Sequence, residues 1–278
     1  MTSINPTLYR PIIAAALAED IHHQDITGAG IFSEHDQCSA QLIAKEDGIV
    51  AGLTVFKETF LLHDSRIQVT LKKADGDQVA NKELVAELSG PTQSVLAAER
   101  VALNVLQRMS GIASLTRQFV DLCAGQSRIL DTRKTAPNLR LLDKWAVRLG
   151  GGMNHRMGLY DMAMLKENHI KAAGGIENAV QKLRDFHDDA VLIEVEVTNL
   201  DELQQALACD VYRIMLDNMS NDMMRKAVAL TDGKTPLEAS GNVNLDTVAG
   251  IAATGVDFIS VGALTHSVKA LDFSLLVV

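Results

Sequence analysis

Aromatic residues are scarce in this chain of 278 residues, since Phe, Trp and Tyr together make up 4 % of it and there is one Trp. A core must therefore be built from aliphatic side chains and Met, which the 47 % of hydrophobic residues permits. Long apolar runs are missing too. No stretch approaches the ~18 uncharged apolar residues of a membrane-spanning helix, so we expect no membrane partner. Residues 1–10 hold no basic segment followed by an apolar run, so we expect no signal peptide.

Cysteine is rare, and the three that occur, Cys38, Cys123 and Cys209, are far apart. They form neither the Cys-x-x-Cys spacing nor the Cys and His clusters of metal sites, and they suggest no disulfide framework. We therefore expect three free thiols buried in packing contacts, in a protein of the reducing cytoplasm.

Positive charge is in deficit over the chain as a whole, which carries a formal net charge of −9. Residues 133–171 are the exception, with eight Lys or Arg against three Asp or Glu. A basic segment in an acidic protein is typical of a pocket for a small anion, because opposite charge near a low-dielectric wall concentrates the substrate. The acidic remainder would repel a long phosphate backbone, so we expect no nucleic acid partner.

The first third of the sequence predicts a helix followed by strands. An apolar face favours a helix over residues 11–20. Strands are expected at three stretches separated by turn signals, residues 41–50, 68–73 and 83–88. This order indicates an α+β sandwich domain. Gly90-Pro91 should then break the chain before a long amphipathic helix that includes residues 95–109.

Beyond residue 128, short apolar runs alternate with helical segments. The apolar runs are residues 129–130, 163–165, 191–197, 212–216, 237–239 and 258–261. The helical segments are residues 139–149, 176–186, 200–208, 222–230 and 245–253. The alternation predicts an α/β fold with a parallel sheet, and without a dinucleotide fingerprint it favours an incomplete (β/α) barrel. The apolar tail should fold back onto the sandwich, so the predicted domains are 1–110 with 267–278, and 111–266.

Charged residues follow the apolar runs, at the place where a barrel builds its active site. Asp131-Thr132-Arg133-Lys134 follows the first run, Lys166 the second and Asp217 the fourth. The third run contains Glu194 and Glu196, which face the same side of a strand because they are two residues apart. Either glutamate, together with Asp217 one strand away, could hold Mg²⁺ or the hydroxyls of a sugar. The pattern does not rank the two.

Small residues end the last two runs. Ser240-Gly241-Asn242 and Gly262-Ala263 each precede an expected helix, where backbone N–H groups can approach an anion closely. Barrels often bind phosphate after their last two strands, and the pair of glycines predicts such a site. The alternative is that these glycines are ordinary turn residues.

Ordered motifs along nearly the whole chain resemble those of the quinolinate phosphoribosyltransferases, also called carboxylating nicotinate-nucleotide pyrophosphorylases. The motifs are Glu99-Arg100 with Leu103-Asn104, Asp131-Thr132-Arg133-Lys134-Thr135, Gly150-Gly151-Gly152-Met153-Asn154-His155-Arg156, Lys166-Glu167-Asn168-His169, Glu194-Val195-Glu196, Leu216-Asp217-Asn218, Ser240-Gly241-Asn242 and Ser260-Val261-Gly262-Ala263. The resemblance implies transfer of phosphoribosyl from phosphoribosyl pyrophosphate to quinolinate. The implied products are nicotinate mononucleotide, pyrophosphate and CO₂, in NAD biosynthesis.

The resemblance also implies roles for individual residues. Those implied to bind the quinolinate carboxylates are Arg133, His155, Arg156 and Lys166, with Thr132 nearby and Arg100 from the neighbouring subunit of a homodimer. Lys134 would contact the pyrophosphate. Glu196 is preferred to Glu194, and with Asp217 it would hold the ribose hydroxyls and Mg²⁺. The residues implied to cradle the 5′-phosphate are Ser240, Gly241 and Gly262.

Two other functions fit part of this pattern. A paralogous phosphoribosyltransferase that uses another acceptor would not be expected to keep the full set of Arg133, His155, Arg156 and Lys166. A non-catalytic sensor of phosphate or nucleotides would be expected to lose Lys134, Glu196 or Asp217. All of these residues are present, which favours the enzyme.

Overall fold

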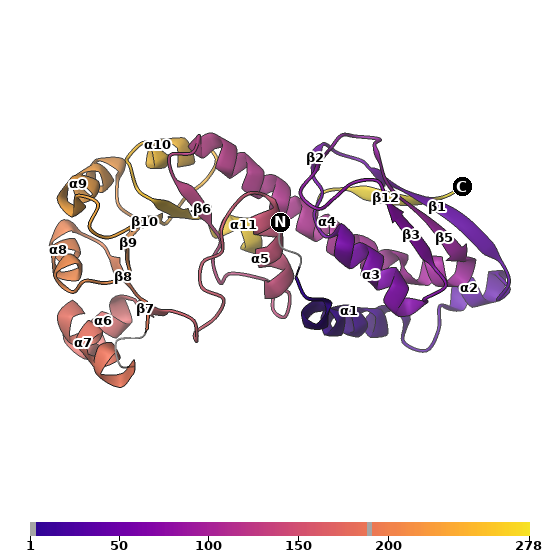
Figure 1. Ribbon diagram of the computed structural model, residues 1–278, viewed down its shortest axis with the longest axis horizontal. Coiled ribbons are helices and arrows are strands. Elements are labelled where there is room, and N and C mark those ends of the chain that lie inside the picture. Colours follow the sequence, from indigo (N-terminus) through magenta and orange to yellow (C-terminus); the bar gives the residue numbers. More distant parts are fainter. Residues whose placement is uncertain (1–3, 188–190) are drawn as a thin grey trace. The chain divides into compact units, whose positions relative to one another are not determined.

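The computed structural model describes residues 4–187 and 191–278 (Figure 1). The chain divides into two compact units. The first comprises Met1–Arg117, Thr135–Gly151 and Ser267–Val278, and the second comprises Gln118–Lys134 and Gly152–His266. The predicted domain boundary after residue 110 stays a prediction, and residues 1–3 of that predicted domain lie outside the described residues.

The first unit contains a four-stranded antiparallel sheet in the order β12-β1-β5-β3. Its strands are β1 (Gln37–Ala44), β3 (Gln68–Leu71), β5 (Leu84–Pro91) and β12 (Phe273–Val277). Apolar side chains alternate along β1, so Leu42 is buried and lies opposite Ala86 on one side and Leu275 on the other. The pairing with β12 confirms that the tail returns to this unit. A short pair, β2 (Gly48–Ile49) and β4 (Gln78–Val79), forms a separate sheet.

The helices of the first half of the chain are α1 (Pro6–Ile21), α2 (Ile26–Ile31), α3 (Leu53–His63), α4 (Thr92–Cys123) and α5 (Arg140–Leu149). The helices expected over residues 11–20, 95–109 and 139–149 are confirmed, whereas α2 and α3 were not foreseen. Gly90-Pro91 does not separate two elements as expected, because both residues complete β5 and α4 begins at the next residue. The expected strand 41–50 is interrupted after Ala44.

The second unit is built on a six-stranded parallel sheet in the order β6-β11-β10-β9-β8-β7. Its strands are β6 (Arg128–Leu130), β7 (Ala163–Leu165), β8 (Ile193–Val197), β9 (Arg213–Asp217), β10 (Leu237–Ser240) and β11 (Phe258–Ser260). Each coincides with a predicted run. Within the described residues β6 and β7 are the two edges and do not pair with each other, so the barrel stays open. The incomplete (β/α) barrel is confirmed.

Helices cover the outer side of this curved sheet (Figure 1). They are α6 (Glu167–Ala173), α7 (Ile176–His187), α8 (Leu200–Ala208), α9 (Asn221–Thr231) and α10 (Val248–Ala252). The short helix α11 (Ala263–His266) follows the carboxyl end of β11 and lies apart from this row. The helix expected from residue 245 begins three residues later. Asn244 Oδ1 accepts hydrogen bonds from the N–H groups of Asp246 and Thr247 and so holds a turn there. The sequence did not predict α6.

The expectations drawn from composition concern membrane-spanning helices and the cysteines. None of the described helices is both long and apolar enough to cross a membrane. All three cysteines are free, as expected, but only Cys123 is buried. Cys38 and Cys209 are partly exposed, so their predicted burial was wrong.

A carboxylate distant in sequence caps helix α3. The residue before the helix is Gly52, which has no side chain with which to cap it. Asp75 instead accepts hydrogen bonds from the N–H groups of Gly52 at 2.6 Å and Leu53 at 2.7 Å, and its other oxygen accepts from the Thr54 hydroxyl at 2.8 Å. A negative charge at a helix N-terminus is stabilising because free N–H groups and the helix dipole both favour it.

Replacing this cap should destabilise the first unit. We expect Asp75→Ala to lower the free energy of unfolding by about 2 kcal/mol, because several charge-assisted hydrogen bonds are lost together. Urea unfolding followed by circular dichroism would measure the change. Glu19→Ala, an exposed residue of α1, is the control and should change little. Equal unfolding midpoints for the two variants would contradict the capping role.

Candidate active site

A cavity of about 820 Å³ opens at the carboxyl ends of the parallel strands of the second unit. Eleven predicted site residues line it, and these are Thr132, Arg133, Lys134, His155, Arg156, Lys166, Glu196, Asp217, Ser240, Gly241 and Gly262. The strand ends therefore bring together groups that are far apart in sequence, as the barrel geometry requires. Arg100 lies elsewhere, exposed on α4 in the first unit.

Two guanidinium groups form a cationic wall of this cavity. Arg133 buries its Nε without a hydrogen-bond partner among the described residues. Arg156 donates to the Met162 carbonyl at 2.9 Å and contacts the Met164 sulfur at 3.7 Å. The carbonyl and the sulfur are both uncharged. Burial and then the positive charge of Arg133 lower the pKa of Arg156. Two positive groups that repel each other in one cavity favour the binding of an anion between them.

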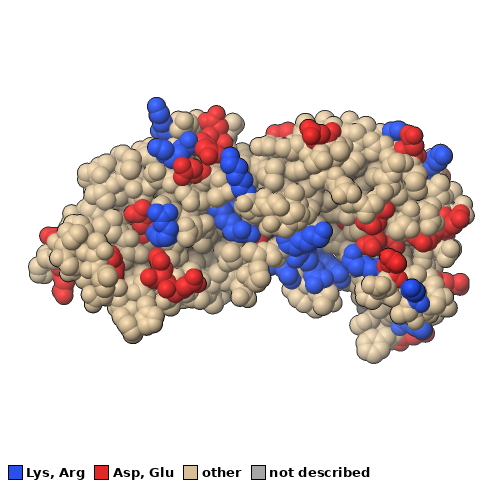
Figure 2. Space-filling view, turned by 180° about the vertical axis from the view of Figure 1, so that it is seen from behind, with Lys and Arg blue, Asp and Glu red and all other residues tan. Residues whose placement is uncertain are grey.

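Positive charge is also gathered on the surface of the molecule. Figure 2 shows Lys and Arg side chains gathered in one large cluster on the face that it draws, whereas Asp and Glu side chains are spread over that face. The chain carries a net charge of −9, so this gathering of cations is local. Such a field would attract small anions to this face and raise their local concentration.

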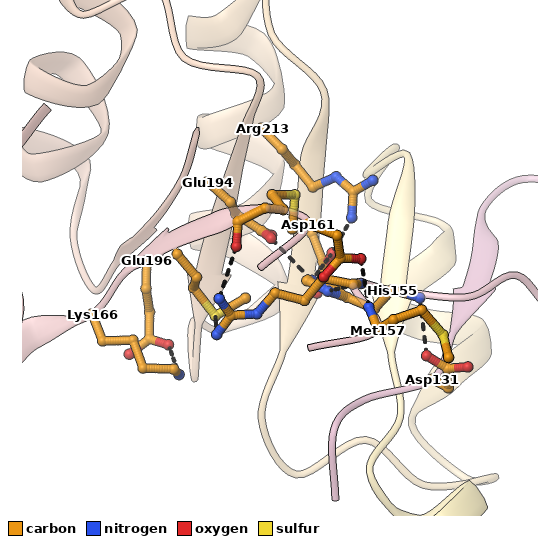
Figure 3. Close-up of polar contacts among 12 residues, drawn as sticks. Asp131, His155, Met157, Asp161, Lys166, Glu194, Glu196 and Arg213 are labelled. Atoms are coloured by element: carbon orange, nitrogen blue, oxygen red, sulfur yellow. Dashed lines mark hydrogen bonds and ion pairs between the residues drawn. The ribbon is translucent and has the colours of Figure 1, made fainter. Parts of the chain in front are cut away.

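Acidic side chains occupy another part of the cavity. Glu196 on β8 forms an ion pair with Lys166, whose Nζ lies 2.5 Å from a carboxylate oxygen of Glu196 (Figure 3). Asp217 ends the neighbouring strand β9 and accepts a hydrogen bond from the Asn218 side chain at 2.9 Å. Both residues remain partly exposed. Carboxylate oxygens on adjacent strands, with open space beside them, suit Mg²⁺, which usually keeps water and substrate oxygens as further ligands.

The turn after β10 brings backbone close to the cavity. Gly241 has a φ of 100°, and a Cβ atom there would stand 2.2 Å from Asn218 Oδ1, so only glycine fits. Asn242 donates to the same oxygen at 3.1 Å and fixes the turn. The expected helix dipole is absent, because α10 begins only at Val248. An anion would meet turn N–H groups here.

Gly262 lines the same cavity just after the end of β11. A Cβ atom there would lie 3.0 Å from the His266 ring and 3.3 Å from the Lys134 side chain. The Lys134 backbone is held in turn, because its carbonyl accepts the Thr265 hydroxyl at 2.9 Å and its N–H donates to Thr132 Oγ1 at 3.1 Å. The small residue therefore keeps room beside the lysine.

A buried cluster of charged residues lies against the cavity (Figure 3). His155 Nε2 is 2.9 Å from a Glu194 oxygen and 3.4 Å from a Glu238 oxygen. Arg213 donates to Glu238 at 2.7 Å and stacks over the Phe258 ring at 4.3 Å. Both glutamates are fully buried. The three oxygen and nitrogen donors converge closely enough to hold a metal ion, but Arg213 already supplies positive charge to this cluster.

The pKa values in this cluster follow from burial and pairing. Burial lowers the pKa of His155, whereas its contacts with Glu194 and Glu238 raise it. The Arg156 N–H group lies 2.7 Å from Nδ1, and only an unprotonated nitrogen can accept it, so the geometry assigns the neutral ring with its proton on Nε2. Burial raises the pKa of Glu194. Burial also disfavours the charged form of Glu238, yet contacts with His155 and Arg213 lower its pKa overall. The charges of Arg213 and Glu238 persist in the interior because the two groups pair with each other.

The segment that carries His155 is fixed by the end of β6. The buried carboxylate of Asp131 accepts the Asn154 side chain at 2.5 Å and the His155 N–H at 2.9 Å. Farther along, Asp161 accepts the N–H groups of Met157 at 2.6 Å and Gly158 at 2.9 Å. These bonds give a loop without regular structure a defined path.

Sequence reasoning missed four residues of this region. Glu238 and Arg213 were read as parts of apolar strands, Asp131 was named only as part of a motif, and His266, which lines the cavity, was given no role in it. The signal that could have identified Glu238 and Arg213 is a single charged residue inside an otherwise apolar run, since such a residue must find a partner when buried. Which residue it pairs with depends on strand register and could not be read from the sequence.

Comparisons with known proteins agree with this arrangement. The family model described as the quinolinate phosphoribosyl transferase C-terminal domain matches residues 112–276, and that of the N-terminal domain matches residues 25–110. A protein of Bacillus subtilis named as a probable carboxylating nicotinate-nucleotide pyrophosphorylase is 47 % identical over 92 % of this chain and 89 % of its own length. A chloroplastic nicotinate-nucleotide pyrophosphorylase of Arabidopsis thaliana is also 47 % identical, over 96 % of this chain and 82 % of its own length.

A solved structure is similar along the whole length. The crystal structure of NadC from Streptococcus pyogenes superimposes with a TM-score of 0.96 at 42 % identity, and all of both chains is covered. The match therefore includes both units and the cavity of the second. With both family models and these relatives in agreement, the chain belongs to the quinolinate phosphoribosyl transferase family.

Proposed function

We propose that this protein transfers phosphoribosyl from phosphoribosyl pyrophosphate to quinolinate and forms nicotinate mononucleotide, pyrophosphate and CO₂. The observation that carries the proposal is the pair Arg133 and Arg156, whose charges repel each other in one cavity, together with Glu196 and Asp217 in the same cavity. The cations match a dicarboxylate, and the carboxylates match a sugar with a metal ion. The named activity of the Bacillus subtilis and Arabidopsis thaliana relatives supports it.

The acceptor fits the cationic wall by charge and shape. Quinolinate is planar and carries two adjacent carboxylates, and a guanidinium group can donate two parallel hydrogen bonds to one carboxylate. Arg133 and Arg156 each present such a group. Binding of the dianion would offset the repulsion between them, because each positive charge would then have an opposite charge beside it.

Lys166 and Glu196 would exchange partners when substrates bind. In the free protein they form an ion pair at 2.5 Å. In the proposed complex, Lys166 turns to a quinolinate carboxylate, and Glu196 turns to a ribose hydroxyl. An exposed ion pair of this kind contributes little stability, because water competes for both charges. Separating it therefore costs little.

Glu196 and Asp217 would also hold Mg²⁺, in part through water and substrate oxygens. When bound, Mg²⁺ would neutralise charge that develops on the leaving pyrophosphate. The oxygen donors and the open space beside them fit this ion. Lys134 would bind the same pyrophosphate. The backbone at Ser240, Gly241 and Gly262 would bind the 5′-phosphate and place the ribose.

The reaction proceeds by exchange of bonds at two carbon atoms. The pyridine nitrogen forms a bond to ribose C1, and the bond from C1 to the pyrophosphate oxygen breaks. The ring nitrogen is then positive and stabilises, by its charge, the electron pair that stays on C2 when CO₂ leaves, and C2 uses that pair to take up a proton. The protein contributes positioning and electrostatic stabilisation to these steps, and a site shielded from water favours both.

We further propose that the working unit is a homodimer in which Arg100 reaches the neighbouring active site. Arg100 is exposed on α4 and offers a third guanidinium group. A two-fold dimer would place two such residues symmetrically, one for each site. A cytoplasmic location is part of the same proposal.

The product assay tests the reaction directly. With quinolinate, phosphoribosyl pyrophosphate and Mg²⁺, we expect the purified protein to release nicotinate mononucleotide and labelled CO₂ in equal amounts. Nicotinate as acceptor should react far more slowly, because it lacks the second carboxylate that the paired arginines bind. A preference for nicotinate would instead support a paralogous enzyme. Absence of product with every acceptor would support a sensor.

Replacing a guanidinium group by an ammonium group tests the acceptor site. We expect Arg156→Lys to raise the KM for quinolinate about 10- to 100-fold, since Lys keeps the charge but cannot bind a carboxylate bidentately. The KM for phosphoribosyl pyrophosphate should change less than about threefold. Arg225→Lys, on the exposed surface of α9, is the matched control. Similar changes in both KM values would contradict the assignment of Arg156 to the acceptor.

Mixing two inactive variants tests the shared site. We expect Arg100→Ala and Lys166→Ala to be inactive alone and to regain about a quarter of wild-type activity when dissociated, mixed in equal amounts and reassembled. Half of the dimers would be hybrids, and each hybrid would have one intact site. If Arg100 served its own subunit, the mixture would recover no activity.

A further inference from the structure

Glu194 is a buried carboxylate that the proposed reaction does not use. It lies in the middle of β8, is 0 % exposed and does not line the cavity. Leaving a charge of this kind inside a barrel is costly unless other groups compensate it. Its position, two residues before Glu196 on the same face of the strand, places it in the layer of side chains next to that of the proposed ribose and metal ligand.

The side chain of Glu194 is directed at one residue of the cavity. One of its oxygens is 2.9 Å from His155 Nε2, and the dashed lines of Figure 3 show this contact. The imidazole is itself buried, with 5 % of its side chain exposed. Glu238, which Arg213 neutralises at 2.7 Å, is the second carboxylate beside Nε2. The Nε2 side of the ring is therefore turned toward carboxylates of the protein.

The other ring nitrogen holds the backbone of the adjacent arginine. The N–H group of Arg156 donates to His155 Nδ1 at 2.7 Å. Both nitrogens of the imidazole are thus engaged within the protein, one with β8 and one with the peptide of Arg156. This continuous set of contacts runs from Glu194 through His155 to the residue whose guanidinium lines the cavity.

We propose that Glu194 is a positioning residue for the acceptor site, which holds the His155 ring so that its Nδ1 fixes the backbone, and hence the guanidinium direction, of Arg156. The proposal rests on the proposed function, because it assumes that Arg156 binds a quinolinate carboxylate. Bidentate binding depends on direction as well as charge, so a small rotation of the peptide would weaken it. His155 then acts by orienting a neighbouring group.

Two substitutions at Glu194 test whether its side chain orients His155 or only fills space in the interior. Glu194→Leu fills a similar space but removes the acceptor for Nε2. Glu194→Gln removes the charge and keeps an oxygen that can accept the same hydrogen bond. We expect Glu194→Leu to raise the KM for quinolinate about tenfold, which corresponds to about 1.4 kcal/mol. Glu194→Gln should restore most of the affinity. The kcat and the KM for phosphoribosyl pyrophosphate should change less than about threefold in both variants.

A double-mutant cycle tests whether Glu194 acts through His155. In a His155→Gln background, Glu194→Leu should add little to the KM for quinolinate, because the connecting ring is already gone. Additive effects would overturn the proposal. Thr254→Val is the matched control, since it removes a buried hydroxyl that donates to the Ile251 carbonyl in the same unit, away from the cavity. It should lower the melting temperature and leave the KM for quinolinate unchanged.

The possible outcomes show whether the positioning role of Glu194 fails alone or whether the proposed function fails with it. A wild-type protein that forms no nicotinate mononucleotide would overturn both. A wild-type protein that forms it, with Glu194→Leu less stable but unchanged in its KM for quinolinate, would overturn only the positioning role. An equal rise in both KM values would also overturn it, because the effect would then pass through the neighbouring Glu196. A selective rise that Glu194→Gln reverses supports it.

Discussion

The repulsion between the guanidinium groups of Arg133 and Arg156 is the constraint on which the second unit depends. Burial and, after it, the charge of Arg133 lower the pKa of Arg156, and Arg133 leaves a buried donor without a partner among the described residues. A folded protein tolerates this cost when a ligand relieves it, and a planar dianion would do so at both groups. In the proposed function, the acidic residues that line the same cavity bind the sugar beside this dianion.

The barrel architecture makes such a cavity possible because parallel strands end at one edge. Side chains from β7, β8, β9, β10 and β11 and from the segment after β6 meet there although they are far apart in sequence. Beneath them, Arg213 pairs with Glu238, and His155 lies in contact with both Glu194 and Glu238 in the interior. The interior of this barrel is thus polar beneath the cavity, and we propose that this layer holds the side chains of the cavity in place.

Much of the second unit follows from the sequence, because parallel strands buried on both faces read as short apolar runs. Polar residues after those runs identified most of the cavity wall. The pattern did not reveal helix α3, whose N-terminus depends on Asp75 more than twenty residues away, nor the pairing of Arg213 with Glu238. Gly241 was recognised as small, but its close approach to Asn218 depends on tertiary structure. Local signals predict elements and strand ends, whereas partners across strands are set by register.

The most direct test of the central claim is a crystal structure of the protein with quinolinate. We expect both carboxylates to contact the guanidinium groups of Arg133 and Arg156, with the ring nitrogen facing the side of the cavity that holds Glu196 and Asp217. Quinolinate bound away from these two arginines, or with its nitrogen turned from the acidic side, would contradict the account.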